Sequence, residues 1–217
     1  MRALIVGSTG MVGSEVLHQC LARKEFTKIT TLDRASTASY NKKVTAIAHP
    51  DFSSFEKIKS KLQGHDVVFY CVGVYTGSVP EKVFAQITVD YLDALAKTVA
   101  NKRTTFVLFS AQGANSNSKV MFAKYKGIAE EKVSAQEFKA TYFFRPGYIH
   151  PLNPAKRHKS IFYRALYVLN PMLQFFFPNH TTTSEQLAKA MVIVAIAGNK
   201  QTVLENRDIK AIVKAQS

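Results

Sequence analysis

The chain has 217 residues, 47% of them hydrophobic and 20% charged, and a formal net charge of +14 at pH 7. This composition is typical of a globular protein and excludes extensive disorder, and the length suits a single domain spanning residues 1–217. No signal peptide precedes the first apolar run, and polar residues and prolines interrupt the apolar stretch at 161–178. We therefore expect a cytoplasmic protein without a membrane-spanning helix.

The first element in the chain is a short apolar run at residues 2–6, which predicts a buried strand. A glycine-rich stretch at residues 7–13 follows it, and apolar residues then recur at helical spacing. A strand, a glycine turn and a helix in this order predict a dinucleotide-binding turn. In such a turn Gly7 permits the tight bend, Gly10 admits a pyrophosphate, and Gly13 lets the helix pack on its strand. The other residues that we expect at the cofactor here are Thr9, Met11 and Val12.

A second strand is expected at residues 29–32, and Asp33 follows it directly. An acidic side chain at this place accepts the adenosine ribose hydroxyls and disfavours a 2′-phosphate. The next residue, Arg34, can instead pair with that phosphate. The two residues indicate opposite cofactors, so the sequence leaves NAD and NADP both open.

Strand and helix signals continue to alternate along the chain. The predicted strands lie at 44–48, 66–73, 105–109 and 141–144, and the predicted helices lie around 55–62, 79–100 and 120–138. This alternation predicts an α/β protein with a doubly wound parallel sheet, the Rossmann fold, whose ligands bind at the carboxyl ends of the strands. Residues at those ends are therefore further candidates for cofactor contacts: Cys71, Val72, Gly73 and Pro146.

The pattern changes after Gly147. Residues 148–183 are rich in prolines and aromatic residues, and we expect them to form an irregular cover on the substrate side of the cleft. Ser184 is the expected cap of a helix that runs to Ala197. A strand at 202–204 and a helix at 206–213 complete the predicted elements.

Two separated residues could do chemistry at the strand ends. Ser110 follows the fifth predicted strand, and Lys126 lies sixteen residues later on a predicted helix. The serine hydroxyl would bind a substrate carbonyl. The lysine would bind the nicotinamide ribose and, by its charge, lower the pKa of a nearby acid. We therefore predict a catalytic pair of Ser110 and Lys126, with Lys126 also a cofactor ligand.

Nearly the whole chain resembles the atypical short-chain dehydrogenases/reductases, in particular the oxidoreductases related to the Tat-interacting protein. The resemblance rests on the glycine turn and on the later segments 89–91, 109–115, 126–130, 145–147 and 204–209. It implies NADP(H) or NAD(H) on a Rossmann fold and a catalytic serine, tyrosine and lysine. The serine corresponds to Ser110 and the lysine to Lys126.

The tyrosine of that family does not carry over, because Phe122 stands four residues before Lys126 and has no proton to donate. Tyr125 lies about 100° from Lys126 around a helix and is a poor substitute. Other groups that could reach the cleft are Tyr75, Tyr148 and His150.

Two functional hypotheses follow from these residues. The first is an NAD(P)-dependent oxidoreductase that acts on a small or apolar carbonyl or alcohol substrate. The second is an NAD(P)H-binding regulator with weakened catalysis, because Phe122 replaces the expected acid.

The basic charge and the cysteines bear on other partners. The run Lys156-Arg157-His158-Lys159, beside the aromatic segment, could attract an anionic membrane surface. Nucleic-acid binding is not expected, since no recognised nucleic-acid-binding motif accompanies the basic residues. Cys20 and Cys71 lie in apolar runs, so we expect core thiols and neither a disulfide nor a metal site. The oligomeric state is not predicted.

Overall fold

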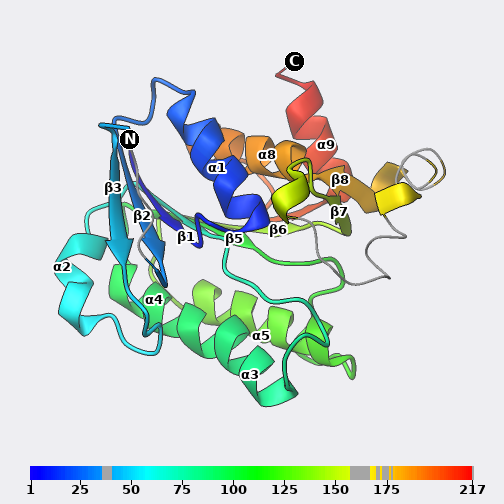
Figure 1. Cartoon of the computed structure of the whole chain (residues 1–217), viewed down its shortest axis with the longest axis horizontal. Coiled ribbons are helices and arrows are strands. Elements are labelled where there is room, and N and C mark those ends of the chain that lie inside the picture. Colours follow the sequence, from blue (N-terminus) through cyan, green and yellow to red (C-terminus); the bar gives the residue numbers. More distant parts are fainter. Residues whose placement is uncertain (36–40, 157–166, 170–171, 173–175, 177, 217) are drawn as a thin grey trace.

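The computed structural model describes residues 1–35, 41–156, 167–169, 172, 176 and 178–216. Its centre is a seven-stranded sheet in the order β3-β2-β1-β4-β5-β6-β9, and every pairing in it is parallel (Figure 1). The strands are β1 (Arg2–Val6), β2 (Lys28–Asp33), β3 (Val44–Ala48), β4 (Val67–Tyr70), β5 (Thr105–Phe109), β6 (Ala140–Arg145) and β9 (Val203–Glu205). This order confirms the predicted doubly wound α/β fold.

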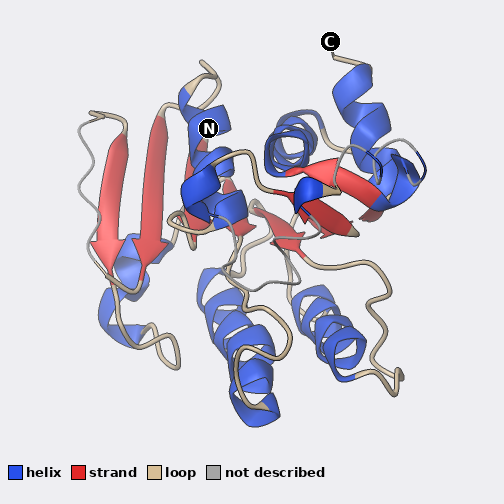
Figure 2. Ribbon diagram, turned by 45° about the vertical axis from the view of Figure 1, so that its right-hand side comes forward, coloured by secondary structure: helices blue, strands red, loops and turns tan. Residues whose placement is uncertain are grey.

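Helices cover both faces of the sheet, so that the strands form the middle layer (Figure 2). On one face lie α1 (Met11–Leu21), α8 (Ser184–Ala197) and α9 (Asn206–Lys214). On the other lie α2 (Lys59–Leu62), α3 (Glu81–Ala85), α4 (Tyr91–Val99) and α5 (Met121–Ser134). Because helices pack on both sides of the sheet, both faces of the central strands are buried.

The alternation of side chains along the central strands divides the core into two layers. Leu4, Val68 and Phe106 pack with the α4 and α5 side, whereas Ile5 and Phe69 pack with α1 and α8. The strand register places Leu4 beside Val68 and Ile5 beside Phe69. Neighbouring residues along a strand, such as Leu4 and Ile5, thus point into opposite layers, and both are buried. These strands are therefore apolar throughout, which makes them easy to recognise in the sequence.

The predicted long helix at 79–100 is divided in the structure. Pro80 is the N-cap residue of α3, and a π-helical turn at Gln86–Asp90 joins α3 to α4. The fourth strand is also shorter than predicted, because β4 ends at Tyr70. Cys71, Val72 and Gly73 therefore lie in the connection beyond the strand, on the edge where ligands bind in this fold.

The predicted cap of α8 is wrong by one residue. The hydroxyl of Thr183 accepts a bond from the backbone N–H of Gln186 at 3.1 Å, and the Gln186 side chain accepts one from the Thr183 N–H at 3.2 Å. Ser184 instead accepts a bond from the Leu152 N–H at 3.3 Å. Thr183 thus caps the helix through the Gln186 N–H, and Ser184 instead binds the backbone of the segment that follows β7.

The segment at 148–183 is expected from the sequence to be irregular, and much of its middle, including residues 157–166, lies outside the described residues. It contains two short strands, β7 (Tyr148–His150) and β8 (Thr181–Thr183), which pair in parallel as a separate small sheet. Three residues per strand are too few to show an alternating pattern, so the sequence gives no signal for them. Among the described residues, no helix combines the length and the apolar character that crossing a membrane requires.

Candidate cofactor and active site

The turn between β1 and α1 has the compact geometry that its glycines predict. Gly7 has a φ of +83°, which favours glycine, and its N–H donates to the Leu32 carbonyl of the neighbouring strand at 3.0 Å. A Cβ atom on Gly13 would lie 2.1 Å from the Gly7 oxygen, so a side chain there has no room. Gly7 and Gly13 thus bring the start of α1 directly against the end of β1.

The N-terminus of α1 faces the cleft without a side-chain cap. Its N-cap residue is Gly10, no described side chain caps the N–H groups of the first turn, and no acidic residue lies in that turn. The N–H groups of Met11, Val12 and Gly13 precede the first helical acceptor pairing and point out of the helix end. These donors, together with the positive end of the helix dipole, fit a phosphate group.

Asp33 stabilises the glycine turn through hydrogen bonds from Ser8 and Thr9. The carboxylate is buried, with 4% of the residue exposed. One of its oxygens accepts a bond from the Ser8 hydroxyl at 2.5 Å. The other accepts bonds from the Thr9 N–H at 3.2 Å and the Thr9 hydroxyl at 3.1 Å. The structure therefore gives Asp33 a supporting role in the turn, beside the ribose contact that stays a prediction. Arg34 follows it and is exposed.

One cavity of about 640 Å³ joins the glycine turn to the predicted catalytic pair. The sequence-predicted residues on its wall are Gly10, Met11, Val12, Cys71, Gly73, Ser110, Lys126 and Pro146. Predicted site residues outside the wall are Gly7, Thr9, Gly13, Asp33, Arg34 and Val72. In the second group, Gly7, Thr9 and Gly13 belong to the turn and the start of α1, and Asp33 and Val72 contact the turn. The structure thus gathers the residues predicted from separate strand ends around one space.

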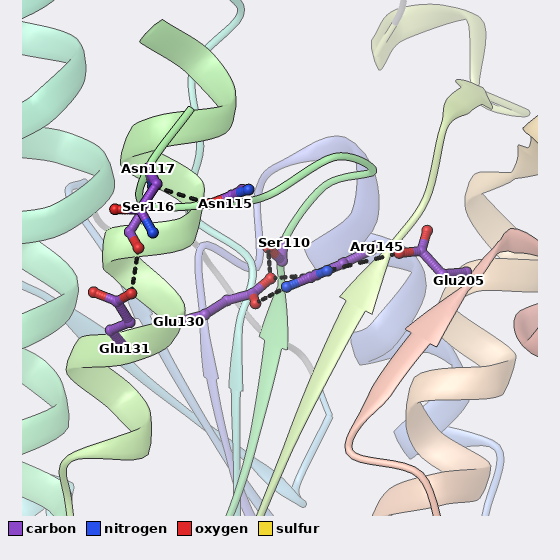
Figure 3. A network of polar contacts seen from close by, with 8 residues as sticks. All are labelled: Ser110, Asn115, Ser116, Asn117, Glu130, Glu131, Arg145 and Glu205. Carbon is purple, nitrogen blue, oxygen red and sulfur yellow. Dashed lines mark hydrogen bonds and ion pairs between the residues drawn. The ribbon is translucent and has the colours of Figure 1, made fainter. Parts of the chain in front are cut away.

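Ser110 takes part in a buried polar network, in which its hydroxyl donates to an oxygen of Glu130 (Figure 3). Arg145, at the end of β6, binds the same carboxylate through Nε at 2.9 Å and through its terminal nitrogen at 2.5 Å. The guanidinium also lies 3.8 Å from Glu205 at the end of β9. Glu130 is only 6% exposed, and the fork of Arg145 neutralises it in the geometry typical of an ionised carboxylate.

Glu130 and Arg145 are not among the predicted site residues, although both lie in segments that resemble the family. Glu130 lies four residues after Lys126, and therefore on the same face of α5. That spacing is the sequence signal for a second polar group at the site. The partner on β6 is distant in sequence, so only the fold brings the two charges together.

Lys126 is almost fully buried beside this network. Its ammonium donates to the Phe109 carbonyl at 3.3 Å and lies 5.4 Å from the centre of the Phe109 ring. Burial lowers the pKa of Lys126 to about 8, although the negative charge of Glu130 opposes the shift. The lysine can therefore exchange its proton near neutral pH, which suits a group that binds a cofactor and assists proton transfer.

The aromatic residues around the cavity decide which hydroxyl can act as an acid. Phe122 lies on the wall and offers none, as the sequence indicated. Tyr125 is not on the wall, and its hydroxyl donates to Glu81 at 3.0 Å. Tyr75 and Tyr148, which the sequence proposed, do line the cavity, and so does Tyr167.

His150 is absent from the wall, and its ring packs edge-on against Tyr167 at 6.0 Å. Two further wall residues, Gln112 and Lys156, were not predicted as site residues.

The two cysteines are buried and carry free thiols. Cys71 reaches the cavity wall, and burial together with the charge of Asp33 raises its thiol pKa to about 12. A thiol in this state does not act as a nucleophile at neutral pH. The described residues contain no cluster of three or more His, Cys, Asp or Glu side chains that could hold a metal ion.

Comparison with known proteins agrees with this geometry. Residues 7–147 match the model of a family described as NAD(P)H-binding. The protein FMP52 of Meyerozyma guilliermondii, named as mitochondrial, is 28% identical over 211 residues, which cover 93% of this chain and 88% of that protein. HTATIP2 of Rattus norvegicus is 30% identical over 150 residues, which cover 66% of this chain and 60% of that protein. The cytoplasmic location expected from the sequence stays a prediction.

Among solved structures, yeast methylglyoxal/isovaleraldehyde reductase Gre2 complexed with NADPH superposes with a TM-score of 0.69 at 14% identity, covering 94% of this chain and 77% of that one. At this identity the likeness shows the fold alone. The family match covers more than half of the chain and begins at the glycine turn. The chain therefore belongs to the NAD(P)H-binding atypical short-chain dehydrogenase/reductase family.

Proposed function

We propose that the protein is an NADPH-dependent oxidoreductase that acts on a small or apolar carbonyl or alcohol. The observation that carries the proposal is the continuity of one cavity from the uncapped start of α1 to Ser110 and Lys126. A dinucleotide with its phosphates at α1 has room to extend toward this pair. NADPH, when bound, would supply a hydride, and Lys126 would hold the ribose and a positive charge beside the substrate.

The preference for NADPH rests on Asp33 and Arg34. Both carboxylate oxygens of Asp33 are engaged by Ser8 and Thr9, so the carboxylate is turned toward the protein. The adjacent Arg34 is exposed at the end of β2 and can pair with a 2′-phosphate. Calorimetric titration of the wild type and of Arg34→Ala tests this preference. We expect the variant to lose about ten-fold or more in affinity for NADPH and little for NADH. Equal losses for both cofactors would contradict it.

The proton in this proposal comes from a tyrosine of the cavity wall. Phe122 cannot supply one, and Tyr148 follows Pro146 and Gly147 directly onto the wall that also carries Lys126. The charge of Lys126 on the same cavity wall would favour the phenolate that proton donation leaves behind. Tyr148 is therefore our first candidate for the general acid, and Tyr75 is the second.

Activity of the purified protein with NADPH on a panel of aldehydes and ketones tests this assignment. We expect Tyr148→Phe to lower kcat by roughly 10²-fold or more while leaving NADPH affinity unchanged. Tyr75→Phe, in the connection after β4, tests the second candidate in the same way. If both variants keep the activity of the wild type, the acid is not one of these tyrosines.

A second function, an NAD(P)H-binding regulator with weakened catalysis, has two observations in its favour. Phe122 occupies a place on the cavity wall, and the Ser110 proton is committed to Glu130. A serine without an available proton does not stabilise a carbonyl oxygen by donation. Under this alternative the wild type binds NADPH without turnover, and Phe122→Tyr gains reductase activity. Turnover by the wild type on any carbonyl of the panel contradicts it.

A further inference from the structure

A lysine outside the expected site reaches the glycine turn. Lys156 ends a short 3₁₀ turn at Pro154–Lys156, and its ammonium donates to the Thr9 carbonyl at 2.6 Å. In Figure 1 this turn, yellow-green on the colour bar, lies beside the start of α1. The contact joins residues that are 147 positions apart in the chain. The family match ends at residue 147, so Lys156 lies beyond the matched part.

Lys156 adds a positive charge to the part of the cavity wall that suits an anion. Lys156 lines the same cavity as Gly10, Met11 and Val12, the residues around the uncapped helix start. The described wall of this cavity contains two lysines, Lys156 and Lys126, and no aspartate or glutamate. A cavity with this charge, walled by low-dielectric protein, concentrates anionic ligands.

The ammonium also retains donor capacity. A lysine carries three N–H donors, and within the described part of the chain Lys156 uses one of them, on the Thr9 carbonyl. A backbone carbonyl is a neutral acceptor and forms a weaker bond with an ammonium than a phosphate oxygen does. The bond to the Thr9 carbonyl therefore positions the Lys156 ammonium at the glycine turn without neutralising its charge.

We infer that Lys156 is a ligand of the cofactor pyrophosphate, which the segment after β7 brings over the glycine turn. This inference rests on the proposed binding of a dinucleotide at α1 and adds a residue from a different part of the chain. Because the pyrophosphate is common to NADPH and NADH, Lys156 contributes equally to both, unlike Arg34. It also connects cofactor binding to the segment that borders the substrate side of the cavity.

The experiment compares Lys156→Met with the matched variant Lys200→Met. Methionine keeps a similar unbranched stem and removes the charge. Lys200 is exposed in the connection between α8 and β9, at the amino end of the strands and therefore away from the cavity. NADPH and NADH affinities are measured by calorimetry at low and high salt, and thermal unfolding is measured without cofactor.

We expect Lys156→Met to weaken both cofactors by the same factor, about ten-fold, and to reduce the salt dependence of binding, because an ion pair is lost. Lys200→Met should bind like the wild type. Unchanged affinity in Lys156→Met would overturn the inference while the proposed cofactor site stands. A loss of affinity with a lowered unfolding temperature and unchanged salt dependence would show a merely structural tie and overturn it as well. Absence of binding by the wild type would overturn the proposed function itself, and with it this inference.

Discussion

Ser110 donates its hydroxyl proton to Glu130, a carboxylate that also accepts two hydrogen bonds from Arg145 (Figure 3). The serine therefore offers lone pairs, and not a proton, to any further partner in the cavity. A substrate hydroxyl or a water molecule would be accepted there more readily than a carbonyl oxygen. The Ser110–Glu130 pair is thus expected to affect both the stability of the fold and the kind of ligand group that Ser110 binds.

Replacement of Glu130 by glutamine tests the structural side of this relationship. The amide keeps the shape but removes the charge, so Arg145 loses its main ionic partner in a buried setting. We expect a loss of roughly 2–4 kcal/mol in the free energy of unfolding, measured by chemical denaturation at pH 7.

The control for Glu130→Gln is its neighbour in the sequence. Glu131 is exposed and accepts a bond from Ser116, so Glu131→Gln makes the same chemical change on the outer side of α5 (Figure 3). We expect it to change stability by less than about 1 kcal/mol. Equal effects of the two substitutions would show that the buried network does not stabilise the protein.

Lys126 is expected to reduce stability in exchange for its role in the cavity. Since burial lowers its pKa to about 8, the charged lysine destabilises the folded state by on the order of 1–3 kcal/mol at pH 7. Lys126→Met should therefore raise the free energy of unfolding at that pH, less whatever the lost bond to the Phe109 carbonyl contributes, while weakening cofactor binding.

The stability difference between Lys126→Met and the wild type should depend on pH. Below pH 8 the lysine is charged in both the folded and the unfolded states, so the full penalty applies. Between pH 8 and about 10.5 the unfolded chain holds a proton that the folded protein has lost, and wild-type stability rises with pH. The advantage of Lys126→Met should therefore shrink across this window. Lys124→Met, an exposed lysine on the same helix, should show no such trend; a constant advantage for Lys126→Met would exclude the proposed titration.

Gly13 allows a direct test of how the turn is packed. An alanine Cβ there would approach the Gly7 oxygen to 2.1 Å, so either the helix or the turn must move. We expect Gly13→Ala to lower the free energy of unfolding by about 2 kcal/mol or more, an overpacking effect. At Gly73 the added Cβ meets nothing within 4 Å, so Gly73→Ala is the control. Comparable unfolding temperatures for the two variants would contradict the tight approach of α1 to β1.

The glycine turn and the sheet could be predicted because their signals are local. The run at β1 is apolar on both faces, and the glycines of the turn are spaced as a dinucleotide site requires. The shift of the α8 cap from Ser184 to Thr183 could not be read from composition, since both residues are good caps and Gln186 decides between them.

The Glu130–Arg145 pair and the Lys156–Thr9 contact depend on chain segments that meet only in the folded protein. For the same reason the wall position of Tyr148 could be suggested but not established from the sequence. Residues 157–159, most of the basic run considered for membrane contact, lie outside the described residues.

The most direct test of the central claim is calorimetric titration of NADPH into the wild type, Gly10→Asp and Gly10→Asn. A Cβ at Gly10 has its nearest neighbour at 3.3 Å, so both side chains fit with a small adjustment, and they differ mainly in charge. We predict micromolar or tighter binding by the wild type, a binding free energy on the order of 8 kcal/mol. We also predict a much larger loss of NADPH affinity for Gly10→Asp than for Gly10→Asn, because a carboxylate would face the pyrophosphate. Equal affinities of the two variants, or no binding by the wild type, would contradict a dinucleotide phosphate at the start of α1.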